Sequence, residues 1–291
     1  MGNNIPNNTD ISIIIVTWNS EDDIPECLNS IYGKEYGFQL ETIIIDNNSS
    51  DNSVKVVKNF NEMQSSDIKI IENKENTGFT IACNQGIRIS TGQYVLLLNP
   101  DTEIIENSLE LLYNKFEKEN IYSAIAPKLL NEDGSIQLSC RTLPRYADLF
   151  SEIFLLSNIF PKSKIFSRWK MNYFSHNEIA EVEQPMAAAL LLKKTVLNEI
   201  QNFDESYYMF FNDVDLCKKM YDNNYKILFY PVARFVHKKG TSIYKDRARM
   251  IKAWNSDCLN YFKKYHYSFL KYNLLKIFLK LTGSIRILFK L

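Results

Sequence analysis

A carboxylate follows directly after the apolar run VLLL, in the sequence Asn99-Pro100-Asp101. A carboxylate at the end of a buried strand, with a second oxygen-bearing side chain nearby, suits a hard divalent cation such as Mg²⁺ or Mn²⁺. Such a cation can bridge a diphosphate and stabilise the charge that develops on it as it leaves. The alternative is that Asp101 only caps a following helix, and the residues alone favour neither interpretation.

A second pair of carboxylates, Asp213 and Asp215, follows the aromatic run YYMFF. A carboxylate beside aromatic side chains is partly desolvated, so its pKa should rise towards a value that suits a general base. Residues two apart on a helical turn point in different directions, so one can face a site while the other caps the helix. Taken alone, the pair is equally consistent with two acids in the first turn of a helix.

A single histidine, His237, ends the strand-like run in RFVHKKGTS. A lone histidine after a strand is more often structural than a ligand. It becomes a candidate metal ligand if its loop returns to Asp101, because neutral imidazole can complete a metal's coordination shell. The adjacent Lys238 and Lys239 either face a diphosphate or lie in solvent.

The elements that must position these residues alternate through the first hundred positions. Apolar, often β-branched runs of strand length occupy residues 11–18, 42–45, 68–73 and 94–101. Helical patterns separate them, and this rhythm predicts an α/β fold with a mainly parallel, Rossmann-like sheet flanked by helices. Ligands bind beyond the carboxyl ends of such strands. The loops at those ends are residues 17–20, 46–51, 73–79 and 99–103.

Beyond residue 130 the rhythm changes. We expect further strands at 186–194 and 226–237, a helix at 215–224, and a helical tail from about residue 246. The simplest division is a catalytic domain at 1–245 and a C-terminal helical basic appendage at 246–291.

Composition limits the classes of protein. The chain has 291 residues, 45% of them hydrophobic, with 34 Lys and Arg against 34 Asp and Glu. A zero net charge argues against a nucleic-acid binder, which normally has a basic excess. Five scattered cysteines indicate neither a zinc cluster nor a disulfide framework and favour a reducing cytosol. The first ten residues do not read as a secretory signal, and no run of about 18 apolar residues predicts a spanning helix.

The tail is basic and amphipathic. No Asp or Glu follows Asp257, whereas seven Lys or Arg do. One helical face would carry Leu270, Leu274, Phe278, Leu281, Ile285 and Leu288. That composition favours an interfacial helix on an anionic membrane surface. The alternatives are a helix packed on the catalytic domain with snorkelling lysines, or a dimer contact.

Six segments in order match a known pattern: ISIIIVTWNS, IIIDNNSSDNS, ENTGFTIACNQGI, YVLLLNPDTEI, FFNDVDLC and VHKKGTS. Together they resemble the family-two glycosyltransferases of the GT-A fold, most closely the rhamnosyltransferase-like branch. The resemblance covers about residues 11–245. It implies a catalytic base, a divalent metal, Mg²⁺ or Mn²⁺, and a nucleotide-diphosphate sugar as donor.

Carried over by position, the resemblance implies a role for each matching residue. Asp213 would be the catalytic base, with Asn212 where the family often has Glu. Asp101 and His237 would bind the metal, with Asn99 where the first Asp of the family's D-x-D often stands. The nucleotide and donor sugar would be bound by Thr17, Asn19, Asp46, Asn76, Gly78 and Asn84, with Asn99 beside them.

The implied function is inverting transfer of a sugar, L-rhamnose from dTDP-rhamnose, to a hydroxyl of a lipid-linked or polysaccharide acceptor in bacterial surface glycan synthesis. The protein would work in the cytoplasm, on the inner face of the cell membrane. A UDP-hexose donor and a non-catalytic scaffold of the same fold are the alternatives. An oxidoreductase would need G-x-G-x-x-G after the first strand, where this chain has TWNSED. Arg141 and Arg145 either contact the acceptor or its phosphate or lie on the surface.

Overall fold

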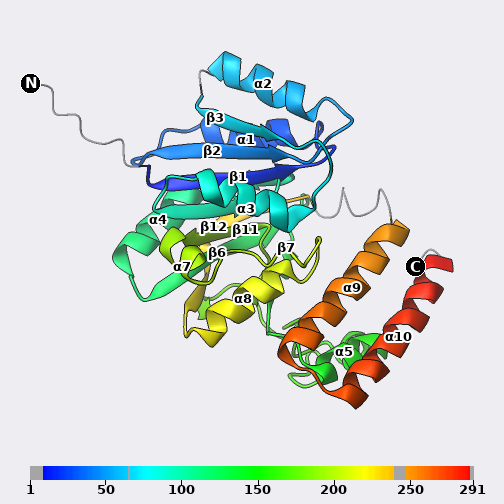
Figure 1. Cartoon of the computed structure of the whole chain (residues 1–291). Helices are drawn as coiled ribbons and strands as arrows, with labels where there is room; N and C mark the ends of the chain where they lie inside the picture. The colour runs from blue at the N-terminus through cyan, green and yellow to red at the C-terminus, as the bar shows by residue number, and fades with distance from the viewer. Residues whose placement is uncertain (1–8, 65, 239–246, 289–291) are drawn as a thin grey trace, which may run out of the picture.

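A ten-stranded sheet forms the centre of the computed structural model, which describes residues 9–64, 66–238 and 247–288 (Figure 1). Its strands follow the order β3-β2-β1-β4-β11-β6-β12-β5, with β7 on β6 and β9 on β12. The strands are β1 (Ile11–Thr17), β2 (Leu40–Asp46), β3 (Ile68–Glu72), β4 (Tyr94–Leu98), β5 (Thr102–Ile104), β6 (Tyr122–Leu130), β7 (Ile136–Gln137), β8 (Cys140–Arg141), β9 (Ala180–Glu181), β10 (Gln184–Pro185), β11 (Ala189–Lys193) and β12 (Lys226–His237). The helices are α1 (Ile24–Tyr32), α2 (Ser53–Gln64), α3 (Phe79–Ile89), α4 (Ser108–Lys118), α5 (Tyr146–Ile153), α6 (Leu156–Ile159), α7 (Lys194–Glu199), α8 (Asn212–Asp222), α9 (Arg247–Tyr265) and α10 (Phe269–Leu288).

The first four strands pair in parallel, as the alternation of strands and helices predicts. Strand β1 lies between β2 and β4 and is buried on both faces, which explains its nearly continuous run of isoleucine. Ile14 packs into an apolar cluster with α3 and α8, whereas Ile13 and Ile15 pack into a second cluster with α1 and α4. The α/β fold with helices on both faces of a mainly parallel sheet is therefore confirmed.

The second half of the sheet is mixed. Strand β11 lies antiparallel between β4 and β6, while β12 runs parallel to β6 and antiparallel to β5. Strand β6 was not expected from the sequence, and neither was a separate two-stranded sheet in which β8 pairs with β10.

The C-terminal helices pack against the rest of the chain. Helix α9 buries Cys258, Tyr261 and Phe262 in the same cluster as α8, and the Tyr261 ring lies 5.7 Å from that of Phe211. Helix α10 then packs on α9 and α5. The predicted helical tail is thus present. The expected boundary between residues 245 and 246 lies outside the described residues.

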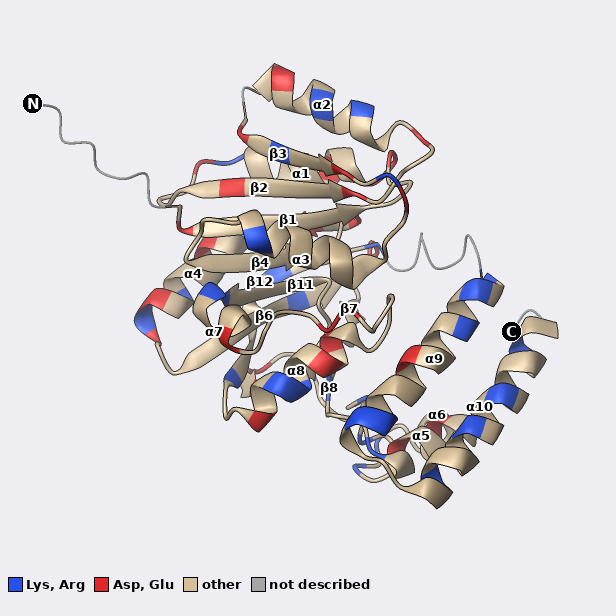
Figure 2. Cartoon of the chain, viewed as in Figure 1, with Lys and Arg blue, Asp and Glu red and all other residues tan. Residues whose placement is uncertain are grey.

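Helix α10 contacts the protein through only part of its apolar surface. Leu275, Leu279 and Gly283 are buried against α9. Most of the predicted apolar face points elsewhere, with Leu270, Leu274, Leu281, Ile285 and Leu288 between 43% and 76% exposed. Lys and Arg side chains lie along the same helix, which contains no acidic residue (Figure 2). Among the described helices, none is both long and apolar enough to cross a bilayer.

Candidate active site

A cavity of about 410 Å³ opens where several strands end. Val16 reaches it from the end of β1, Asn99 from the end of β4 and His237 from the end of β12. Five of the predicted site residues line it: Asn76, Asn99, Asp101, Asp213 and His237. The other predicted site residues are not among its lining residues: Thr17, Asn19, Asp46, Gly78 and Asn84.

Asp101 and His237 meet at the edge of the cavity although they come from distant strands. Strand β5 pairs antiparallel with the end of β12, which brings Thr102 opposite His237. As a result, Asp101 Oδ1 lies 3.4 Å from His237 Nε2, and the Asn99 amide nitrogen lies 3.3 Å from the same ring nitrogen. The pairing of β5 with β12 thus brings His237 to Asp101. This proximity is the condition under which the sequence makes His237 a candidate metal ligand.

The second ring nitrogen of His237 is held by Gln137. His237 Nδ1 lies 2.7 Å from Gln137 Oε1, and Gln137 Nε2 donates to the His237 carbonyl at 3.2 Å. An amide oxygen only accepts, so Nδ1 carries a proton, and in the neutral imidazole this leaves the lone pair on Nε2. A partner on the far nitrogen is the usual way in which proteins orient a metal-binding histidine.

The donor set fits a divalent cation. Asp101 Oδ1 is buried, and no described residue gives it a hydrogen bond. A cation beside it would satisfy this carboxylate oxygen and use the lone pair of His237 Nε2. Within the described parts of the chain, no three His, Cys, Asp or Glu residues are grouped to hold a metal. Mg²⁺ and its relatives are commonly bound by one or two protein ligands together with substrate phosphates, which matches this pair.

Asp213 faces the cavity from the first turn of α8. Its Oδ2 accepts a hydrogen bond of 3.0 Å from Gln184 Nε2, and its Oδ1 accepts one of 2.8 Å from the Val214 backbone. Burial raises the pKa of Asp213, while the charge of Arg141 and backbone N–H groups lower it in part. A carboxylate with a raised pKa and room for a hydroxyl beside it is suited to accept a proton.

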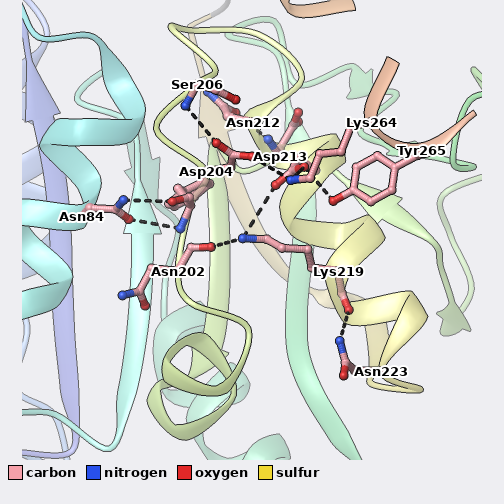
Figure 3. A network of polar contacts seen from close by, with 12 residues as sticks. Asn84, Asn202, Asp204, Ser206, Asn212, Asp213, Lys219, Asn223, Lys264 and Tyr265 are labelled. Carbon is pink, nitrogen blue, oxygen red and sulfur yellow. Dashed lines mark hydrogen bonds and ion pairs between the residues drawn. The ribbon is translucent and has the colours of Figure 1, made fainter. Parts of the chain in front are cut away.

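Asp215 does not line the cavity and instead forms ion pairs with Lys219 and Lys264, two residues labelled in Figure 3. The side chain is fully buried, and its Oδ1 accepts hydrogen bonds of 2.7 Å from both Lys264 Nζ and Tyr265 Oη. Lys264 also reaches Asp204 at 2.7 Å. Asp215 therefore ties α8 to α9, and of the two neighbouring acids only Asp213 lines the cavity.

The residues predicted at the nucleotide form a tight polar group behind the cavity. Thr17 Oγ1 donates to Asp46 Oδ1 at 2.9 Å, and the Ser49 backbone N–H donates to Asp46 Oδ2 at 2.9 Å. Asn19 accepts from the Ser50 backbone at 2.7 Å and so joins the loops that follow β1 and β2. In this structure these contacts fix the two loops beside Trp18 and Asn47, which do line the cavity.

Gly78 and Asn84 serve the packing of the chain in this structure. Gly78 has φ +86°, and a Cβ on it would lie 2.7 Å from the Tyr208 carbonyl, so the close approach it allows is to Tyr208. Asn84 exchanges hydrogen bonds of 3.0 and 3.1 Å with the Phe203 backbone and also contacts Glu205 (Figure 3). The sequence placed both at the donor because their segment, ENTGFTIACNQGI, lies next to Asn76, which does line the cavity.

The small sheet supplies two residues that act on Asp213, and one of them, Arg141, lines the cavity. Residues Arg141 and Gln184 are paired across β8 and β10, and both act on the Asp213 carboxylate. The sequence offered two interpretations for Arg141, and the structure places it in the cavity lining. Gln184 was missed, because a two-residue strand has no periodicity to reveal it. Lys238 pairs with Glu26 and Glu103 outside the cavity lining, and Lys239 lies outside the described residues.

Asp257 of α9 holds another part of the cavity wall. This carboxylate is 2% exposed and accepts backbone hydrogen bonds from Tyr208, Met209 and Phe210, at 3.4, 3.2 and 2.9 Å. Met209 and Phe210 line the cavity. This role could not be predicted from the sequence, because Asp257 lies far along the chain in a helix that we expected to be an appendage.

The family model of glycosyl transferase family 2 matches residues 12–160, which is more than half of the chain. The chain belongs to glycosyl transferase family 2. The match contains β1 to β8 and therefore Asp101, but it ends before Asp213 and His237. The family match does not assign the chain to the rhamnosyltransferase-like branch.

Curated relatives of this family 2 chain include two glycan-building enzymes. The low-salt glycan biosynthesis hexosyltransferase of Haloferax volcanii is 29% identical over 222 residues, covering 75% of this chain and 64% of the relative. The poly(ribitol-phosphate) beta-glucosyltransferase of Bacillus spizizenii is 33% identical over 126 residues, covering 43% of this chain and 20% of the relative. The chain thus covers less than two thirds of the length of either relative.

Solved structures share the fold at low identity. A mannosyltransferase from Pyrobaculum calidifontis in complex with GDP-Man and Mn²⁺ has a TM-score of 0.59 at 16% identity, covering 95% of this chain and 70% of that one. The S. aureus protein TarS in complex with UDP-GlcNAc has a TM-score of 0.56 at 15% identity, covering 92% of this chain and 70% of that one. These likenesses support the GT-A fold of this family 2 chain.

Proposed function

We propose that this chain is a metal-dependent, inverting glycosyltransferase. It would move a sugar from a nucleotide-diphosphate donor to a hydroxyl of an acceptor. The observation that carries the proposal is that a carboxylate with a raised pKa, Asp213, lines the same cavity as the Asp101 and His237 pair. Family membership supports the reaction class, and the cavity supplies the two chemical functions that the class requires.

In the proposed reaction the acceptor hydroxyl oxygen forms a bond to the anomeric carbon while the bond from that carbon to the diphosphate breaks. The attack comes from the face opposite the diphosphate, so the configuration inverts. The hydroxyl proton passes to Asp213, and Gln184 fixes the carboxylate by its hydrogen bond to Oδ2. A divalent metal held by Asp101 and His237 would stabilise the charge of the departing nucleoside diphosphate.

The proposed donor is dTDP-L-rhamnose, on the resemblance of the six sequence segments to the rhamnosyltransferase-like branch. A hexose donor on UDP is the second candidate. It is favoured by the names of relatives, which include a hexosyltransferase, a glucosyltransferase and a poly-beta-1,6-N-acetyl-D-glucosamine synthase. Asn99 stands where an acid would add negative charge near the diphosphate. Both candidate donors carry a diphosphate, so Asn99 favours neither of them.

We further propose a lipid-linked or polysaccharide acceptor in bacterial surface glycan synthesis, used at the inner face of the cell membrane. The exposed apolar side of α10 supports an anionic membrane surface as partner, because lysines lie beside it and acids are absent. A second acid-free stretch, residues 153–177, carries further exposed apolar side chains, among them Leu155, Ile159 and Phe160. Its exposed Phe154 contacts Phe278 of α10 with ring centres 5.5 Å apart.

The test is a transfer assay with dTDP-rhamnose, UDP-glucose, UDP-N-acetylglucosamine and GDP-mannose, each with membrane lipid extract and Mn²⁺. Release of the nucleoside diphosphate that depends on extract identifies the donor, and the anomeric configuration of the product, read by NMR, tests inversion. Asp213→Asn is the matched negative control. Donor binding without turnover for any combination would favour the non-catalytic scaffold instead.

A further inference from the structure

Arg141 presents an unpaired guanidinium to the cavity. Its side chain lines the cavity, and none of the described residues forms a hydrogen bond or a short ion pair with it. The guanidinium lies over the Trp169 ring, whose centre is 5.4 Å from the guanidinium carbon. Burial lowers the pKa of Arg141, and the nearby carboxylates Asp213 and Glu152 raise it in part. Burying a cation whose N–H donors lack partners costs free energy, and a bound anion would offset that cost.

The Arg141 charge lies close to Asp213. Asp213 and Glu152 are the carboxylates whose charge raises the pKa of Arg141. Across the small sheet, Arg141 pairs with Gln184, which donates a hydrogen bond to Asp213. The positive charge therefore lies close to the proposed base.

The ring beneath the Arg141 guanidinium is itself held in place. Trp169 is 8% exposed and packs against Phe211 with ring centres 6.3 Å apart. A stacked guanidinium keeps its fork of N–H donors free for a planar or tetrahedral oxyanion, which a lysine ammonium would bind with less geometric selection.

We infer that Arg141, stacked on Trp169, binds an oxyanion of the phosphate class that belongs to the acceptor. This inference rests on the proposed function, because it takes Asp213 as the residue that receives the acceptor hydroxyl. A phosphate bound here would bring that hydroxyl to Asp213 and would favour acceptors that carry phosphate near the reacting sugar. The same chemistry could instead come from the donor diphosphate, and the experiment separates these two sources.

Inorganic phosphate is the probe. It is titrated calorimetrically into the full chain with Mg²⁺, first alone and then with dTDP or UDP at saturation. We expect phosphate to bind in both conditions, and Arg141→Gln to weaken its binding at least tenfold in each. Arg141→Lys should keep part of the affinity. The nucleoside diphosphate itself should bind the wild type and Arg141→Gln within twofold.

Arg145→Gln is the matched control, since this arginine lies four residues away, is exposed and does not line the cavity. It should leave phosphate affinity unchanged. Phosphate that binds Arg141→Gln as well as it binds the wild type overturns the inference, and so does failure of phosphate to bind the wild type. Displacement of phosphate by the nucleoside diphosphate would assign Arg141 to the donor and overturn the acceptor site. A wild type that binds phosphate through Arg141 but no nucleoside diphosphate would contradict the proposed function and leave the anion site standing.

Discussion

Asp213 and Asp215 lie on the same first turn of α8 and face opposite surroundings. Asp213 accepts a hydrogen bond from Gln184, whereas Asp215 is buried and accepts hydrogen bonds from Lys264 and Tyr265 of α9. A helical turn separates the directions of residues two apart by more than a right angle. The two acids therefore have different roles. Asp213 can act on a substrate in the cavity, and Asp215 anchors α8, the helix that carries Asp213, to α9.

Asp213→Asn should lower kcat by about 10²–10⁴-fold and leave donor affinity within about twofold, because a general base acts only in the chemical step. Asp215→Asn should behave differently. It weakens a buried ion pair, so the free energy of unfolding should fall by roughly 1–3 kcal/mol while the chemical step is retained in the folded fraction. We would measure kcat by steady-state kinetics, donor affinity by titration and the free energy of unfolding by denaturant for both variants. Near-normal turnover for Asp213→Asn, with loss for Asp215→Asn, would move the base to Asp215.

The raised pKa of Asp213 also has a consequence for stability. The folded state holds the Asp213 proton more tightly than the unfolded chain, where the pKa is about 3.9. This contribution is therefore fully present below the unfolded pKa and is lost as the pH rises through the folded pKa. Asp213→Asn removes the titration, so its melting temperature relative to the wild type should rise as the pH increases from about 4 through the folded pKa. A difference that is independent of pH would show that the pKa of Asp213 is not raised.

The pair of Asp101 and His237 predicts metal dependence of donor binding. Asp101→Ala should abolish the part of donor affinity that EDTA removes from the wild type, because it takes away the charged ligand. Gln137→Leu leaves both ligands but removes the partner of His237 Nδ1, and it should weaken metal-dependent binding by about 10–100-fold. Calorimetric titration of donor with Mn²⁺ or EDTA gives both values. If the wild type bound the donor with equal affinity with and without EDTA, donor binding would not depend on a metal.

Substitution of Asp257, which lies on α9, should lower catalytic efficiency by disturbing the cavity wall. Asp257→Asn leaves one acceptor for three backbone N–H groups, so the wall formed by Met209 and Phe210 should shift. Small displacements of positioning groups reduce rates strongly, and we expect kcat/KM to fall about 10–100-fold, with both parameters affected. The control Asp222→Asn removes an ion pair at the partly exposed end of α8 and should leave kcat/KM unchanged. Equal kinetics for the two variants would show that α9 does not support the cavity.

The exposed side of α10 should bind anionic vesicles. Serine at four of its exposed positions should lower sedimentation with phosphatidylglycerol vesicles at least tenfold; the substitutions are Leu270→Ser, Leu274→Ser, Leu281→Ser and Ile285→Ser. Serine at Met63 and Ile121, which are 82% and 64% exposed on other elements, is the matched control. Binding should weaken as salt rises, since the lysines act through screened charge. Unchanged sedimentation of the fourfold variant would contradict the membrane proposal.

Much of the fold was predictable because its central strands are apolar on both faces. The runs at 11–18, 42–45, 68–73 and 94–101 became β1 to β4, and the run at 226–237 became β12. Strand β6 was missed because Pro127 interrupts it, and proline normally excludes a central strand. The structure accommodates it with a register shift in β12 between Tyr230 and Arg234.

Apart from Asn76, which the resemblance supplied, the cavity residues that could be predicted end strands or begin a helix. Asn99, Asp101, Asp213 and His237 were found in this way, and all four line it. Their chemical roles stay predictions. Gln184 and Asp257 were out of reach, because their positions depend on tertiary contacts between segments far apart in the sequence. Asn84 was placed at the donor by resemblance, whereas in this structure its amide is engaged by Phe203.

The central claim is that a nucleotide-diphosphate sugar binds in this cavity with a metal, and thermal unfolding tests it most directly. The full chain is melted with dTDP, UDP and GDP and their sugars, each with Mn²⁺, Mg²⁺ or EDTA. A ligand of the folded state at a hundred times its Kd adds about 2.7 kcal/mol to the free energy of unfolding, which is a rise of several degrees in Tm. We predict such a rise for dTDP- or UDP-linked ligands with metal, and its loss in Asp101→Ala. No rise with any nucleotide, with or without metal, would contradict the account.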